Sequence, residues 1–148
     1  MSTHELLNKA IKIATKAHKK QTDKYDAPYL GHVFRVMNAG KTIDEKIVGV
    51  LHDVVEDHPE FSFDYLKEKG FPDYILEAVE SLTKREEEHL DYDAFIARIE
   101  KSPLAIAVKL NDLRDNMDLT RCTEPLQEKD LKRFNKYLKA YLYLSEKY

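Results

Sequence analysis

The stretch KIVGVLHDVVEDHPEF, Lys46 to Phe61, combines an apolar helical pattern with a dense group of polar side chains. At 100° per residue around a helix, one arc holds only apolar residues, namely Ile47, Val48, Val50, Leu51, Val54 and Val55. The opposite arc holds His52, Asp53, Glu56 and Asp57. The pattern predicts one buried helix from about Ile43 to His58, which ends there because Pro59 disfavours helical geometry in the residue before it.

The polar arc of this helix has two interpretations. Glu56 and Asp57 alone would ordinarily be a solvated acidic face, and a histidine on an apolar helix is more often a core residue than a ligand. A buried carboxylate is costly, however, unless it takes up a proton or recruits a cation. The second interpretation is therefore a cation site at His52 and Asp53, beside open space left by Gly49 one turn earlier.

Further ligands for such a cation are available on two other expected helices. His32, in PYLGHVFRVM, lies among residues typical of a core. Asp112, in AVKLNDLRDNMDL, interrupts an apolar stripe, and Asn116 points the same way one turn later. The alternative for Asp112 is an ordinary position on the surface of an amphipathic helix.

Helical periodicity dominates the rest of the chain, and no segment alternates apolar and polar residues as a half-buried strand would. We expect an all-α, single-domain bundle of about seven or eight helices over residues 1–148, with Thr3 as the first N-cap. The expected helices are Thr3 to Lys20, a short one carrying His32, Ile43 to His58, Phe63 to Lys69, Tyr74 to Lys84, Tyr92 to Lys101, Leu104 to Leu119 and Glu128 to Tyr148. The run KREEEHL, Lys84 to Leu90, is expected to be a solvated turn or else a mobile flap.

The composition excludes several classes of function. With 24 basic against 27 acidic residues, the net charge of −3 gives no general attraction to nucleic acid or to an anionic membrane. The single Cys122 excludes a disulfide framework, and no apolar run is long enough for a membrane span. We therefore expect a cytoplasmic protein. We also expect its C-terminal tyrosines to pack against the first helix or to form a homo-oligomer contact. These tyrosines are Tyr137, Tyr141, Tyr143 and Tyr148.

These motifs, taken in order, resemble the HD-domain metal-dependent phosphohydrolases, in which a His, a His-Asp pair and a distant Asp follow one another. The closer resemblance is to the hydrolase domain of Rel/Spo homologues and to the small alarmone hydrolases, which remove pyrophosphate from the 3′ position of (p)ppGpp. It rests on AHKKQ, PYLGH, LHDVVED, SLTK and VKLNDLRDNM, and it covers about Ala17 to Leu119.

The resemblance implies a role for each matched residue. One divalent ion, usually manganese, would be held by His32, His52, Asp53 and Asp112. Two imidazoles and two carboxylates suit Mn²⁺, and Fe²⁺, Co²⁺, Ni²⁺ or Zn²⁺ are alternatives. Glu56 and Asp57 match the acidic pair of the family and would exchange protons with the attacking water or the leaving oxygen, Glu56 being the principal group. Asn116 and Lys24 match positions that contact the nucleotide, while Thr83 and Lys84 would hold phosphate oxygens or lie on the surface.

Three positions depart from the alarmone hydrolases. Asp23 stands where an arginine usually stacks on the base, Leu119 replaces a threonine, and Val33 replaces the proline after the first metal histidine. We therefore expect a metal-dependent phosphohydrolase of a nucleotide, with (p)ppGpp as the most specific candidate. The alternatives are hydrolysis of another nucleotide or phosphoester, or a non-catalytic nucleotide-sensing helical module.

Overall fold

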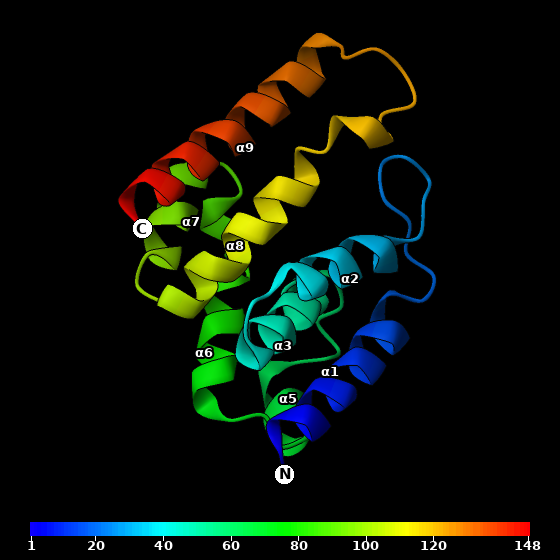
Figure 1. The fold of residues 1–148 in the computed structure, drawn as a ribbon, viewed down its shortest axis with the longest axis vertical. Coiled ribbons are helices and arrows are strands. Elements are labelled where there is room, and N and C mark those ends of the chain that lie inside the picture. The colour runs from blue at the N-terminus through cyan, green and yellow to red at the C-terminus, as the bar shows by residue number, and fades with distance from the viewer.

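The computed structural model describes all residues from Met1 to Tyr148 and consists of helices and their connections (Figure 1). The elements are α1 Thr3–His18, α2 Tyr29–Ala39, α3 Ile43–Leu51, α4 Val54–Asp57, α5 Phe63–Glu68, α6 Asp73–Leu82, the 3-10 turn η1 Glu86–Glu88, α7 Tyr92–Ile99, α8 Pro103–Asn116, the 3-10 turn η2 Leu119–Arg121 and α9 Glu128–Lys147. The only β-type pairing is an isolated bridge between Thr22 and Pro28. The expected all-α class is confirmed.

Helix α3 lies at the centre of the bundle and packs against α1, α2, α6 and α8 (Figure 1). Its last five residues, Ile47 to Leu51, are all buried. Thr42 begins the helix with a capping box, in which its hydroxyl accepts from the N–H of Glu45 and the Glu45 carboxylate accepts from the N–H of Thr42. A helix that is apolar on every side belongs in the interior. The residues that follow α3 therefore emerge in the middle of the fold.

Gly49 allows α2 to approach α3 closely. A Cβ atom at this position would lie 3.2 Å from Cα of Met37 and 3.3 Å from the carbonyl oxygen of Val36, both in the backbone of α2. The expected open space beside Gly49 is therefore wrong, because α2 fills it. The contact brings His32, on α2, close to the end of α3.

The two ends of the chain differ from expectation. Ser2 is the N-cap of α1, through a capping box with Glu5, so the assignment to Thr3 is wrong. At the other end, α9 lies along α8 and away from α1 (Figure 1), so the expected contact of its tyrosines with the first helix is also wrong. Tyr137 and Tyr141 instead pack against the main core.

That core is a continuous cluster of 27 buried residues, to which α1, α3, α6, α7 and α8 contribute most. No helix combines the length and the apolar character that crossing a membrane requires.

The connection between α6 and α7 is held more firmly than a solvated turn would be. Glu88 is 5% exposed, and its carboxylate accepts from the guanidinium of Arg98 at 2.7 and 2.9 Å. Arg98 also donates to the carbonyl oxygens of Glu80 and Thr83. Arg98 therefore joins the turn to the end of α6, and the expectation that the whole turn is solvated is wrong at Glu88.

Candidate metal centre

The helix expected from Ile43 to His58 is broken in the middle. Helix α3 ends at Leu51 and α4 begins at Val54, with His52 and Asp53 in a turn between them. Nδ1 of His52 donates to the carbonyl oxygen of Gly49 at 2.6 Å, where the N–H of Asp53 would bind in a continuous helix. The single-helix prediction is therefore wrong, and the break lets His52 and Asp53 face the same point.

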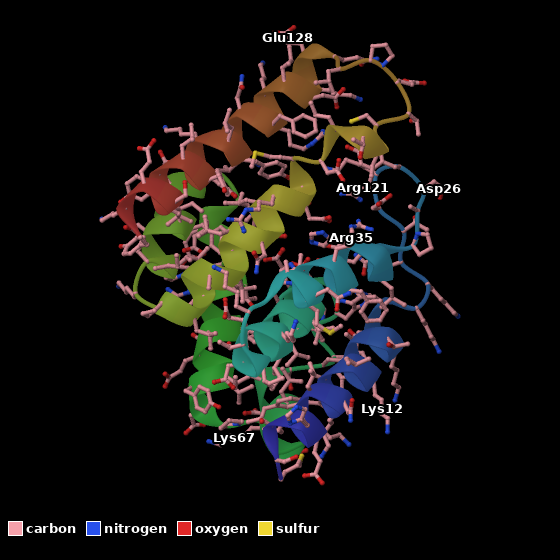
Figure 2. All side chains as sticks on the ribbon, viewed as in Figure 1. Lys12, Asp26, Arg35, Lys67, Arg121 and Glu128 are labelled. Carbon is pink, nitrogen blue, oxygen red and sulfur yellow. The ribbon has the colours of Figure 1, made fainter.

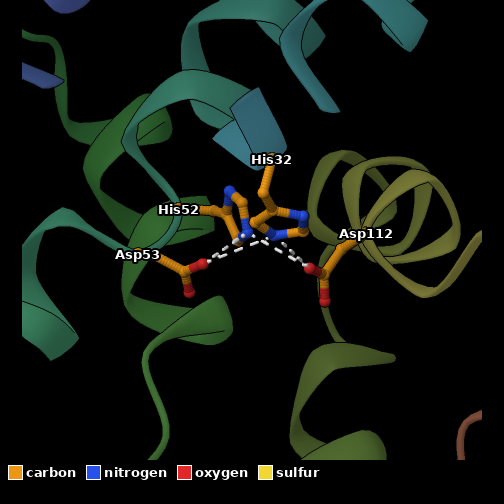
Figure 3. Close-up of side chains that lie close together, drawn as sticks. All are labelled: His32, His52, Asp53 and Asp112. Carbon is orange, nitrogen blue, oxygen red and sulfur yellow. Dashed lines mark hydrogen bonds and ion pairs between the residues drawn. The ribbon is translucent and has the colours of Figure 1, made fainter. Parts of the chain in front are cut away.

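Side chains from three parts of the chain converge at this break (Figure 3). Nε2 of His52 lies 3.0 Å from Oδ2 of Asp53 and 3.3 Å from Oδ1 of Asp112. Nε2 of His32, from α2, lies 3.0 Å from the same oxygen of Asp112, on α8, and 3.6 Å from Oδ2 of Asp53. The four atoms all lie within 4.8 Å of one another, a spacing at which they would share one ion.

Both imidazoles are oriented by their other ring nitrogen. Nδ1 of His32 donates to Oδ2 of Asp115 at 2.6 Å, and Nδ1 of His52 is bound to Gly49 as described. An Nδ1–H that donates in this way leaves the Nε2 lone pair for a cation. The two histidines therefore present ligand atoms toward the centre of the group.

The two carboxylates are fixed by neighbouring donors. Tyr29 donates its hydroxyl hydrogen to Oδ2 of Asp53, Lys109 donates to Oδ2 of Asp112 at 2.8 Å, and Asn116 donates to Oδ1 of Asp112 at 3.2 Å. These contacts hold both carboxylates in place before any ion binds.

The electrostatics of the group reflect its burial. Burial disfavours the charged imidazole of His52, but Asp53 and Asp112 outweigh it and raise its pKa to about 10. Burial also opposes ionisation of Asp112, and here Lys109 and the two histidines outweigh it and hold the pKa well below its usual range. Protons on the histidines thus balance the carboxylates, and a divalent cation would displace those protons on binding.

The group lies in the wall of a cavity of about 340 Å³. Glu56 and Lys84, both expected site residues, line this cavity as well. The backbone N–H of Lys84 donates to Oε1 of Glu56 at 2.6 Å, so the α6–α7 connection fixes the carboxylate. Burial raises the pKa of Glu56, while this hydrogen bond opposes the rise. A carboxyl with a raised pKa is better suited to exchange protons than one at its ordinary pKa.

Asp57 does not line the cavity. Its Oδ2 accepts from Nε2 of Gln21 at 3.0 Å, on the side of the break that faces α1. The side-chain oxygen of Gln21 accepts hydrogen bonds from Nδ1 of His18 and from Nε2 of His58, both at 2.7 Å. The structure therefore separates the two members of the expected acidic pair.

The other expected contact residues fall into two groups. Lys24 and Asn116 line the cavity, whereas Thr83 does not, and its hydroxyl donates to the carbonyl oxygen of Val79. Asp23 also lines the cavity, but its Oδ1 accepts from the N–H groups of Tyr25 and Ala27.

Arg121 lies beside the loop before α2 that carries Asp23, toward the same side of α8 as Arg35 (Figure 2). Its guanidinium lies 3.4 Å from Oδ2 of Asp23 and 3.3 Å from Oδ2 of Asp115. The Asp23 carboxylate therefore shares a cationic partner with Asp115. Asp23, which stands where the alarmone hydrolases usually have a stacking arginine, thus lies beside an arginine from another part of the chain.

Several residues at the site were not predicted to belong to it from the sequence, namely Tyr29, Lys109, Asp115, Arg121, Lys136 and Tyr137, the last of which was expected only as a packing or oligomer contact. Lys109 and Asp115 each stand three residues from Asp112, a helical spacing that would have indicated them. Tyr29 and Arg121 act across long sequence separations, and nothing in the local pattern marks them.

A scan against models of protein families finds none that matches this chain. The assignment of this candidate metal site therefore rests on its geometry. It offers two imidazole nitrogens and two carboxylate oxygens that could hold one divalent metal ion, all of them pre-oriented and all buried except the partly exposed Asp53.

Proposed function

We propose that this protein is a metal-dependent phosphohydrolase of the HD-domain type. The observation that supports it best is the convergence of His32, His52, Asp53 and Asp112 in the wall of a cavity that also contains Glu56. The resemblance of the sequence motifs to that family agrees with this arrangement.

The donor set fits a divalent ion with some preference for oxygen ligands, and manganese is the ion we propose. Such an ion would lower the pKa of a water molecule and polarise a phosphoryl oxygen. The fit rests on the chemistry of the donors and on the bonds that fix them. Imidazoles with Nδ1 engaged and carboxylates held by Tyr29 and Lys109 need little rearrangement to bind a cation, which would displace the protons on Nε2.

The protein's own groups would supply the rest of the chemistry. Glu56, with its raised pKa and its position on the cavity wall, would take a proton from the attacking water or give one to the leaving oxygen. Asn116, which lies beside Asp112, would contact the sugar and phosphate of the substrate, and Lys24 would lie near its base.

The proposed substrate is a nucleotide or a phosphoester of similar size. A cavity of about 340 Å³ is in the range of small-molecule sites, and lysines and tyrosines line its rim. Removal of pyrophosphate from the 3′ position of (p)ppGpp is the most specific candidate. Another nucleotide remains the alternative, because Asp23 replaces the stacking arginine of the alarmone hydrolases.

The test is hydrolysis of a nucleotide panel that includes ppGpp, by the manganese-loaded full chain, with phosphate and pyrophosphate release measured. We expect release from at least one member, abolished in His52→Ala. Absence of release from every member, by a protein shown to hold manganese, would contradict the proposal and favour a nucleotide-sensing module.

A further inference from the structure

Two lysines share one aromatic ring at the rim of the cavity. The ammonium of Lys84, in the α6–α7 connection, lies 5.6 Å from the ring centroid of Tyr92. The ammonium of Lys136, on α9, lies 4.9 Å from the same centroid. Lys109, which is paired with Asp112, lies 5.7 Å from that centroid as well. Lys84 and Lys136, more than fifty positions apart in the chain, thus add two positive charges around one ring.

The arrangement continues along the rim. Lys136 also lies 5.3 Å from the ring centroid of Tyr137. Lys24, in the loop before α2, lies 5.9 Å from the same centroid. All five side chains line the cavity. Cations and rings therefore alternate along the cavity lining, from Lys84 through Tyr92, Lys136 and Tyr137 to Lys24.

The acidic groups of the cavity are engaged elsewhere. The Asp112 carboxylate binds Lys109 at 2.8 Å, Asp23 binds Arg121, and Glu56 accepts from a backbone N–H. Lys84 and Lys136 form no ion pair. Burial lowers the pKa of Lys136, and the nearby Lys84 and Lys109 lower it further, as expected for an ammonium group that lacks an acidic partner.

We propose that Lys84 and Lys136 form an anion subsite beside Tyr92, which binds a phosphate group of the substrate other than the one that is hydrolysed. A phosphate between the two ammonium groups would form charge-assisted hydrogen bonds and relieve their mutual repulsion. This inference rests on the proposed function, since it adds the second anionic group to the substrate of the same cavity.

The subsite lies on the cavity rim and does not include the four candidate ligands. Its loss should therefore weaken substrate binding and leave the chemical step intact. Hydrogen bonds to charged groups contribute about 1.5 to 3 kcal/mol each, which corresponds to roughly tenfold or more in binding for each lysine. We expect KM to rise and kcat to stay close to that of the wild type.

The direct test is a calorimetric titration of the metal-free full chain with inorganic pyrophosphate. Lys84→Met, Lys136→Met and the double variant are compared with Lys132→Met, which removes an exposed lysine one turn earlier on α9, outside this cavity. We expect each cavity variant to weaken binding about tenfold and the control to have no effect. Undetectable binding by the wild type, or equal binding by the double variant, would overturn the inference.

A second experiment separates this inference from the proposed function. The manganese-loaded wild type and double variant are assayed with two phosphoesters that differ only in a second, non-reacting phosphate. A higher kcat/KM for the bisphosphorylated ester, lost in the double variant, is the expected result. If both esters are hydrolysed equally well, the subsite is wrong and the function stands. If neither is hydrolysed, the function fails, and the pyrophosphate titration still decides the subsite.

Discussion

The backbone N–H of Lys84 donates a hydrogen bond of 2.6 Å to Oε1 of Glu56. The two residues are 28 positions apart, and the bond joins the α6–α7 connection to the short helix that follows the candidate ligands. A carboxylate fixed in this way keeps its second oxygen for a proton transfer inside the cavity. The Glu88–Arg98 pair, which holds the same connection to α6, supports Glu56 indirectly.

Replacing Glu56 tests its role as the proton-transfer group. Glu56→Gln should retain the metal and lose turnover by about 10²- to 10⁴-fold, because glutamine has the shape of the carboxyl but exchanges no proton. The measurements are kcat and metal content by mass spectrometry. Glu60→Gln, which changes an exposed carboxylate at 67% side-chain exposure, is the matched control. A rate near that of the wild type in Glu56→Gln would show that the assignment is wrong.

Asp57 should matter less for turnover than Glu56. Its carboxylate lies outside the cavity and is bound to Gln21, so it does not reach a substrate held there. We expect Asp57→Asn to lower kcat by less than about tenfold, well below the effect of losing a general acid or base. If the rate instead falls as far as in Glu56→Gln, Asp57 must turn into the cavity during the reaction.

The sequence predicted the helical class and the set of candidate ligands for identifiable reasons. Helical periodicity is strong where α3 and α8 cross the core, and each ligand is a polar residue that interrupts an apolar pattern. The resemblance to the HD-domain phosphohydrolases, in their order of a His, a His-Asp pair and a distant Asp, then indicated which interruptions belong together. The geometry of Figure 3 agrees with that grouping.

The sequence did not predict the features that depend on which of several donors binds a given backbone carbonyl. The break at His52 arises because an imidazole donates to the carbonyl of Gly49, a choice that periodicity does not reveal. The separation of Asp57 from Glu56 follows from that break. Contacts such as His32 with Asp115 join residues 83 positions apart and depend on how α2 and α8 pack.

The Glu88–Arg98 pair should contribute to stability in a pH-dependent way. The hydrogen bonds from Arg98 lower the pKa of Glu88 from its usual value of 4.5 to about 2. Its contribution is therefore fully present above about pH 4.5 and is lost as the pH falls toward 2.

Glu88→Gln should lower the free energy of unfolding at pH 7 by about 1 to 3 kcal/mol, since it weakens a buried ion pair. The difference from the wild type should shrink as the pH falls through this window. Urea unfolding at several pH values measures both effects, with the neighbouring Glu87→Gln as control. A difference that is independent of pH would contradict the assigned pair.

Gly49→Ala tests the close approach of α2 to α3. Alanine favours a helix interior by about 1 kcal/mol over glycine, but the new methyl group would press on the backbone of α2, and such overpacking costs about 1 to 3 kcal/mol. We expect a net loss of stability and weaker metal binding, because α2 carries His32. In the control Gly31→Ala, the new methyl meets only the flexible end of Arg35. Equal stabilisation by both substitutions would show that α2 moves away freely.

Titration of the metal-free full chain with Mn²⁺, followed by calorimetry, tests the central claim most directly. We expect one ion per chain, and a loss of at least tenfold in affinity in both His32→Ala and Asp112→Asn, with Asp93→Asn, an exposed change, as the control. If no stoichiometric ion binds, or if both ligand variants bind manganese as the wild type does, these four side chains do not form a metal centre.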